Sequence, residues 1–138
     1  MRFAYLTYDE VNEHWAQKFA NTRDVRLDVL TCRDIAAAPN YDAVVCDVDS
    51  LPPAERAATL AALLKCQPKG TVAVHSYNIT THRARRLRRR GLIVVRRLRA
   101  GVFGRLVAVV SARQQQQALA LKTRGIGRSH VTLLRASK

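Results

Sequence analysis

Short apolar runs alternate with longer mixed stretches along most of the chain. Five of these runs are of strand length, at residues 3–6, 25–30, 43–46, 71–74 and 92–95. The stretches between them are helix-like or rich in turn residues. This alternation is typical of a parallel sheet covered by helices, so we predict an α/β domain with five parallel strands.

The first mixed stretch, residues 10–21, places Val11, Trp15 and Phe19 four residues apart. This spacing predicts a helix that turns these three side chains toward the core. The next stretch has room only for a short helical turn around residues 34–38, and we expect Pro39 to end it.

A second full helix is predicted after residue 50. Asp49 or Ser50 is expected to cap it, and Pro52 or Pro53 to open it. Its predicted core face consists of Ala57, Leu60, Leu63 and Leu64.

Two more helices complete the predicted pattern. Residues 80–90 offer only Ala84 and Leu87 for packing, and Gly91 is expected to end this helix. The last helix is predicted over about residues 102–122, with Phe103 and Leu106 facing inward.

The polarity of the strands predicts their order. In residues 25–30 apolar side chains alternate with Arg26 and Asp28, which is typical of an edge strand, whereas residues 43–46 and 71–74 are apolar on both faces. This favours a flavodoxin-like three-layer sandwich with strand order 2-1-3-4-5. We expect this domain to span residues 1–122, with a basic tail at 123–138.

Composition agrees with one domain in the cytoplasm. The chain has 138 residues, of which 48% are hydrophobic, enough for a core without disulfides or metal. No apolar run reaches the length of a membrane span and a strand pattern begins at Arg2, so we predict a cytoplasmic protein that contacts no membrane. Cys32, Cys46 and Cys66 share no CxxC spacing and are expected to be reduced thiols.

Charge is divided sharply along the chain. All ten acidic residues lie in residues 1–55, whereas residues 56–138 carry 19 bases and no acid. Nine arginines fall within one short segment: Arg83, Arg85, Arg86, Arg88, Arg89, Arg90, Arg96, Arg97 and Arg99. Because no acid is interleaved among them, they predict a surface that attracts polyanions or acidic proteins.

Polar side chains follow four of the predicted strands. The carboxyl ends of parallel strands meet at one edge of a sheet, where such folds bind ligands, so these side chains are expected to share a site. No glycine-rich loop follows the first strand, which argues against dinucleotide and P-loop sites. The candidate residues are Asp9, Glu10, Asp47, Asp49, Ser76 and Arg97.

Over residues 1–113 the sequence resembles a response-regulator receiver domain. Asp9 and Glu10 match the acidic end of the family's first strand, residues 41–47 (YDAVVCD) match the strand that ends in the phosphoacceptor, and Ser76 matches a small hydroxyl residue. Further matches are Pro52 or Pro53 and the arginine-rich segment 85–91, which ends in glycine.

This resemblance implies a set of roles. Asp47 would accept a phosphoryl group, with a histidine kinase as a candidate partner, and Ser76 and Arg97 would contact that group. Carboxylates suit Mg2+, which such a transfer requires to offset the negative charge. The implied ligands of Mg2+ are Asp9, Glu10, Asp47 and Asp49.

Two positions depart from the family's pattern. Tyr8 occupies the place of a second acid, and Arg97 that of a lysine, whose compact ammonium an arginine does not reproduce. We therefore predict a divergent receiver that serves as a signalling or protein-interaction module. It is expected to have no enzymatic activity beyond its own phosphorylation and dephosphorylation, and to act in trans through Arg83, Arg85, Arg86, Arg88, Arg89 and Arg90.

Two other functions stay open. One is polyanion or nucleic-acid binding through the arginines between Arg83 and Arg99, although no aromatic residues are interleaved there. The other is a phosphatase, because Asp47-Val48-Asp49 also resembles the first motif of haloacid-dehalogenase-type enzymes. Those enzymes need further acids downstream for Mg2+, and none follows Glu55.

Overall fold

The computed structural model describes residues 1–128, and its centre is a five-stranded sheet. The strands are β1 (Arg2–Leu6), β2 (Arg26–Leu30), β3 (Ala43–Asp47), β4 (Val72–His75) and β5 (Ile93–Val95). They lie in the order β2-β1-β3-β4-β5, and each neighbouring pair is parallel. The predicted flavodoxin-like fold and strand order are confirmed.

The polarity of each strand explains its place in the sheet. Every residue of β3 and of β4 is buried, because these strands have neighbours on both edges and helices on both faces. Strand β2 lies at the edge, where Arg26 is exposed and Leu27 is buried.

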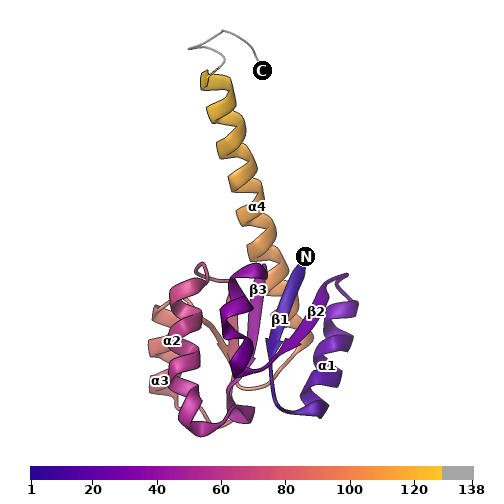
Figure 1. The fold of residues 1–138 in the computed structure, drawn as a ribbon, viewed down its shortest axis with the longest axis vertical. Helices are drawn as coiled ribbons and strands as arrows, with labels where there is room; N and C mark the ends of the chain where they lie inside the picture. The colour runs from indigo at the N-terminus through magenta and orange to yellow at the C-terminus, as the bar shows by residue number, and fades with distance from the viewer. Residues whose placement is uncertain (129–138) are drawn as a thin grey trace. The chain divides into compact units, whose positions relative to one another are not determined.

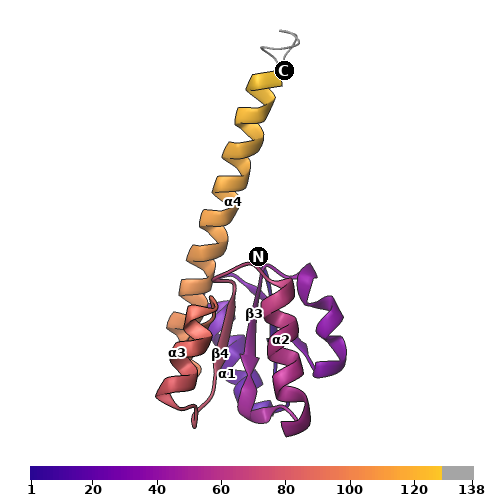
Figure 2. The ribbon, with the colours of Figure 1, turned by 90° about the vertical axis from the view of Figure 1, so that its left-hand side faces the viewer.

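Helices cover both faces of the sheet. Helices α2 (Arg56–Cys66) and α3 (Thr81–Arg89) lie on one face, and α1 (Glu10–Asn21) lies on the other (Figure 1, Figure 2). The face beneath α2 and α3 packs Leu6, Val44 and Cys46 against Leu60 and Leu63. Burial of these apolar side chains stabilises that face of the sheet.

Aromatic side chains fill the other face. Phe3, Tyr5 and Phe103 are fully buried, and the rings of Phe3 and Phe103 stack with centroids 6.4 Å apart. The ring of Phe19, in α1, lies next to that of Phe103, with 6.2 Å between their centroids. The predicted inward positions of Phe103 and Leu106 are confirmed.

Helix α1 exists as predicted, but its predicted core face is wrong. Ala16 and Ala20 are fully buried, whereas 65% of Val11 and 47% of Trp15 are exposed and Phe19 is half-buried. The two alanines are also four residues apart, and their small side chains let the helix approach the sheet closely. Val11 and Trp15 therefore face outward, whereas Phe19 lies at the edge of the core beside Phe103.

The start of α2 also differs from the prediction. The helix begins at Arg56, after the short 3₁₀ helices η2 (Val48–Ser50) and η3 (Pro53–Glu55). Neither Asp49 nor Ser50 caps it, since its N-cap is Glu55, which makes no side-chain capping bond. Leu60 and Leu63 are buried and Leu64 is half-buried, as predicted, but Ala57 is exposed and Thr59 takes a buried position instead.

The connection between β2 and β3 is a 3₁₀ helix, η1 (Cys32–Asn40). Pro39 lies inside it and does not end it, contrary to the prediction. The side chain of Asp34 accepts hydrogen bonds from both the backbone N–H and the hydroxyl of Thr31 and so fixes the start of the helix.

Helix α3 matches the prediction closely. The hydroxyl of Thr80 caps it by accepting a hydrogen bond from the backbone N–H of Arg83, at 3.2 Å. Ala84 is buried and Leu87 is half-buried. The helix ends at Arg89, and Gly91 follows its C-cap residue, Arg90. The φ of Gly91 is +97°, which favours a residue without a side chain.

The last helix, α4 (Ala100–Arg128), extends beyond the predicted range of residues 102–122. Its first residues belong to a compact unit of residues 1–107, and a second unit starts at residue 108. Most of the predicted tail, residues 129–138, lies outside the described residues, so the predicted domain and tail stay predictions. Within residues 1–128, no helix is long and apolar enough to cross a membrane.

Candidate functional site

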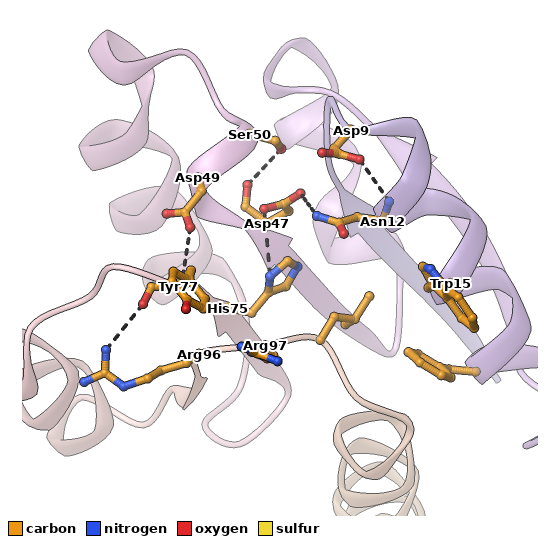
Figure 3. Close-up of a pocket in the computed structure, with 12 residues that line it drawn as sticks. Asp9, Asn12, Trp15, Asp47, Asp49, Ser50, His75, Tyr77, Arg96 and Arg97 are labelled. Atoms are coloured by element: carbon orange, nitrogen blue, oxygen red, sulfur yellow. Dashed lines mark hydrogen bonds and ion pairs between the residues drawn. The ribbon is translucent and has the colours of Figure 1, made fainter.

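A pocket of about 600 Å³ lies at the carboxyl end of the sheet, where the sequence predicts a site (Figure 3). We call it the strand-end pocket. Its polar lining residues are Asp9, Asn12, Asp47, Asp49, Ser50, His75, Arg96 and Arg97, and its other lining residues are Trp15, Phe19, Tyr77 and Leu98.

The register of the sheet brings these residues together. Asp47 at the end of β3 pairs with His75 at the end of β4, and His75 pairs with Val95, the residue before Arg96. Leu6 pairs with Cys46, which places Thr7 beside Asp47. Parallel strands of similar length therefore end together, and the loops after them form the pocket.

Asp47 lies at the bottom of this arrangement and is almost completely buried, with 2% of its surface exposed. The hydroxyl of Thr7 and the side-chain amide of Asn12 both donate hydrogen bonds to its Oδ2, at 2.8 Å and 2.9 Å. A buried carboxylate needs such donors to offset its lost hydration. Thr7 and Asn12 therefore hold Oδ2 of Asp47 in place.

His75 lies on the other side of Asp47, with 3.8 Å between its Nδ1 and Oδ1 of the carboxylate. Its Nε2 is 2.7 Å from the hydroxyl of Tyr5. Burial lowers the pKa of His75, opposed in part by the nearby charge of Asp47. Burial raises the pKa of Tyr5, so the phenol keeps its proton and can donate it to Nε2.

The other predicted carboxylates of the pocket are engaged locally. Asp9 is the N-cap of α1, and its Oδ1 accepts hydrogen bonds from the backbone N–H groups of Val11 and Asn12 at 2.9 Å and 3.0 Å. Asp49 accepts a hydrogen bond from the hydroxyl of Ser76 at 2.7 Å and another from the backbone N–H of Tyr77 at 2.8 Å. Asp49 therefore joins the loops after β3 and β4.

The structure does not gather the residues implied to hold a magnesium ion into one cluster. Within residues 1–128, no group of three histidine, cysteine, aspartate or glutamate side chains is placed to hold a metal. Asp9 faces the helix N-terminus and Asp47 faces Thr7 and Asn12. The Mg2+ site implied by the resemblance stays a prediction, and these contacts do not support it.

Most of the candidate residues do meet in the pocket. Asp9, Asp47, Asp49 and Arg97 line it together, whereas Glu10 is exposed and is not among its lining residues. Ser76 lines a neighbouring cavity of about 380 Å³. The proposed roles of Ser76 and Arg97 toward a phosphoryl group also stay predictions.

The two arginines at the end of β5 differ in their contacts. Arg96 donates hydrogen bonds to the backbone carbonyl oxygens of Tyr77 and Ile79. The guanidinium of Arg97 lies 5.4 Å from the centre of the Tyr77 ring, and within residues 1–128 it forms no ion pair. Arg97 is therefore an unpaired positive charge in the pocket.

Sequence reasoning missed the neutral partners of Asp47. Thr7 directly follows β1 and Asn12 comes three residues after the helix cap Asp9, but such positions carry no distinctive signal by themselves. Trp15 was assigned to the core because of its spacing with Val11 and Phe19. Its place on the pocket wall depends on which face of α1 packs on the sheet.

A second feature lies on α3. Six arginines on this helix and at its end are exposed, and within residues 1–128 none forms an ion pair with an acid: Arg83, Arg85, Arg86, Arg88, Arg89 and Arg90. Arg83, Arg86 and Arg90 also line a depression of about 240 Å³ between α2 and α3. Its apolar lining residues are Ala57, Leu60, Ala61, Leu64 and Leu87, and we call it the α2–α3 groove.

Comparison with known proteins establishes the fold. No protein-family model matches the chain, and no curated protein is significantly similar to it. Among solved structures, the chain is similar to the signal receiver domain of a protein assigned as a Luxo repressor from Vibrio parahaemolyticus. The TM-score is 0.67 at 14% identity, and the match covers 86% of this chain and 95% of that chain. The chain therefore has the fold of a receiver domain.

Proposed function

We propose that this chain is a receiver-fold signalling module that binds an acidic segment of a partner protein through the α2–α3 groove. The observation that carries this proposal is the set of exposed arginines on α3 that have no acidic partner among residues 1–128. Like charges at helical spacing repel one another, so this surface is stabilised when carboxylates bind to it.

The groove favours a protein over a nucleic acid as the partner. Arg83, Arg86 and Arg90 lie at helical spacing along one side, and the leucines of α2 and α3 provide an apolar floor. An amphipathic helix with leucines on one face and glutamates beside them matches both features. A phosphate backbone would use the arginines but would leave the apolar floor without a partner.

The surroundings of Asp47 support a module that acts without phosphorylation. Acceptance of a phosphoryl group requires access to a carboxylate oxygen, yet Asp47 is 2% exposed and Oδ2 already has two donors. In this proposal the partner binds the unmodified protein. Phosphorylation of Asp47 with Mg2+, as the resemblance implies, is the competing mechanism.

The experiment that tests this proposal measures binding of a fluorescent synthetic helix of glutamate, alanine and leucine by anisotropy. The key variant is the double charge reversal Arg83→Glu/Arg86→Glu. Its matched control, Arg85→Glu/Arg89→Glu, makes the same charge change on the same helix at residues that do not line the groove. We expect the first to weaken binding at least about tenfold, or about 1.4 kcal/mol. The control and Asp47→Asn should have much smaller effects.

Two results would contradict the proposal. Equal losses in both double variants would indicate attraction to charge in general. Tighter binding of double-stranded DNA than of the helix, with a steep dependence on salt, would favour the nucleic-acid alternative. Replacement of the leucines of the peptide by alanine separates the contribution of the apolar floor from that of charge.

A further inference from the structure

One wall of the strand-end pocket is apolar, in contrast to its acidic residues. Trp15, Phe19 and Leu98 line it, and nearly half of the surface of Trp15 is exposed. The ring of Trp15 stacks against that of Phe19, with 6.1 Å between their centroids. An apolar wall of this kind inside a polar pocket offers a surface to a flat apolar group.

The strand-end pocket contains charged side chains of both signs. Each of the three carboxylates accepts two hydrogen bonds from neutral donors of the protein, which hold it in place and leave it charged. Arg97 has no such partner within residues 1–128, and Lys18 lies close to the Trp15 ring, 5.2 Å from its centre. The guanidinium of Arg97, on the side of the pocket away from the aspartates, is therefore the place where an anion could bind.

The placement of these groups sets the shape of a ligand. In Figure 3 the three aspartates lie at one end of the pocket, Arg96 and Arg97 lie at the opposite end, and Trp15 lies to one side. Asn12 donates its amide N–H to Asp47, which leaves its carbonyl oxygen as an acceptor. The volume of about 600 Å³ is within the usual range for small-molecule sites.

We propose that the strand-end pocket binds a small planar aromatic anion. Its ring lies against Trp15, its carboxylate or phosphate binds the guanidinium of Arg97, and a donor on the ring reaches Asn12. This site goes beyond the proposed function, because the α2–α3 groove shares none of these residues.

The 138-residue chain contains one tryptophan, Trp15, so its fluorescence reports on this pocket directly. The probes are adenosine monophosphate and 4-hydroxybenzoate, which join a ring that carries a hydrogen-bond donor to a phosphate and to a carboxylate. Adenosine supplies a ring without the anion, and inorganic phosphate supplies the anion without a ring. We expect saturable changes with an aromatic anion, and binding of adenosine and of phosphate weaker by about tenfold or more.

Variants assign the site. Arg97→Gln should weaken binding at least about tenfold, and Arg97→Lys less, because lysine keeps the charge but loses the planar fork. Arg99→Gln is the matched control, because Arg99 is exposed and does not line the pocket. Calorimetry with Trp15→Ala tests the wall independently of fluorescence. Binding of only one of the two aromatic anions supports the site and shows whether it takes a phosphate or a carboxylate.

Other outcomes overturn the proposal. These are the absence of saturation with both aromatic anions, or equal effects of Arg97→Gln and Arg99→Gln. The Arg97→Gln variant should bind the acidic helix as tightly as the wild type, because Arg97 does not line the α2–α3 groove. The failure of this proposal can therefore be distinguished from the failure of the proposed function.

Discussion

Asp47 is held by neutral donors from two different elements. Thr7 follows β1 and Asn12 lies in the first turn of α1, so the carboxylate links the strand end to the helix start. His75 and Tyr5 extend this network into the buried face of the sheet. A polar network of this kind fixes side-chain positions when all its members are satisfied.

The state of His75 makes stability depend on pH. Burial lowers its pKa below the ordinary value of 6.5, so below about pH 6.5 the unfolded chain binds a proton that the folded chain does not. The free energy of unfolding should therefore be fully retained above that pH. It should decrease as the pH falls from about 6.5 toward the lowered pKa of the folded state. Urea unfolding at a series of pH values measures this slope.

The matched variants are His75→Gln and His82→Gln. The first should lose the decrease between neutral and mildly acidic pH, and the second should keep it, because His82 is exposed. An increase in stability on acidification that depends on His75 would mean that the imidazolium pairs with Asp47. It would contradict the neutral network.

Only some residues of the candidate site could be predicted from the sequence. Asp9, Asp47, Asp49 and Arg97 were found because charged residues directly after apolar strands stand out in the sequence. The partners of Asp47 could not be found this way, because threonine and asparagine are common after strands and in first helical turns. Hydrogen-bond geometry distinguishes them, and it depends on the packing of α1.

Helix α1 shows how two faces with the same period can compete. Val11 and Trp15 are spaced like Ala16 and Ala20, and the alanines face the sheet because small side chains allow close packing. The cost of leaving Trp15 outside is offset in part by its contacts with Phe19 and Lys18. The choice of face decides what lines the strand-end pocket.

Substitutions on α1 test this choice of face. Ala16→Leu should overfill the contact with the sheet and lower the free energy of unfolding by about 1–3 kcal/mol. Val11→Gln should change it by about 0.5 kcal/mol or less, because this side chain is mostly exposed. Urea denaturation compares the two variants. A larger loss in Val11→Gln than in Ala16→Leu would show that the apolar stripe faces the core.

Strands were predicted more accurately than helix boundaries. The ends of the five apolar runs lie within one residue of the ends of the five strands, because buried strands leave a continuous apolar signal. The start of α2 was missed because Pro53 opens a separate 3₁₀ turn, and η1 was underestimated because Pro39 is tolerated inside it. Both errors concern short connections without a regular period.

The whole molecule combines a receiver fold with an uneven distribution of charge. The acidic residues all lie in residues 1–55, and within residues 1–128 the arginines of α3 have no acid to pair with. Asp9, Asp47 and Asp49 lie at the strand ends, where the sequence predicts a phosphorylation site. Each of these carboxylates accepts hydrogen bonds from donors within the protein. We therefore propose that partner binding takes place at the arginine-lined groove and does not require transfer of a phosphoryl group to Asp47.

Intact-mass analysis after incubation with Mg2+ and acetyl phosphate tests whether Asp47 accepts a phosphoryl group. Wild type and Asp47→Asn are compared, with a receiver domain known to accept phosphate from this donor run in parallel. We expect both proteins to keep their mass while the parallel sample gains a phosphoryl group. A phosphoryl adduct on the wild type that Asp47→Asn lacks would contradict it and establish Asp47 as a working phosphoacceptor.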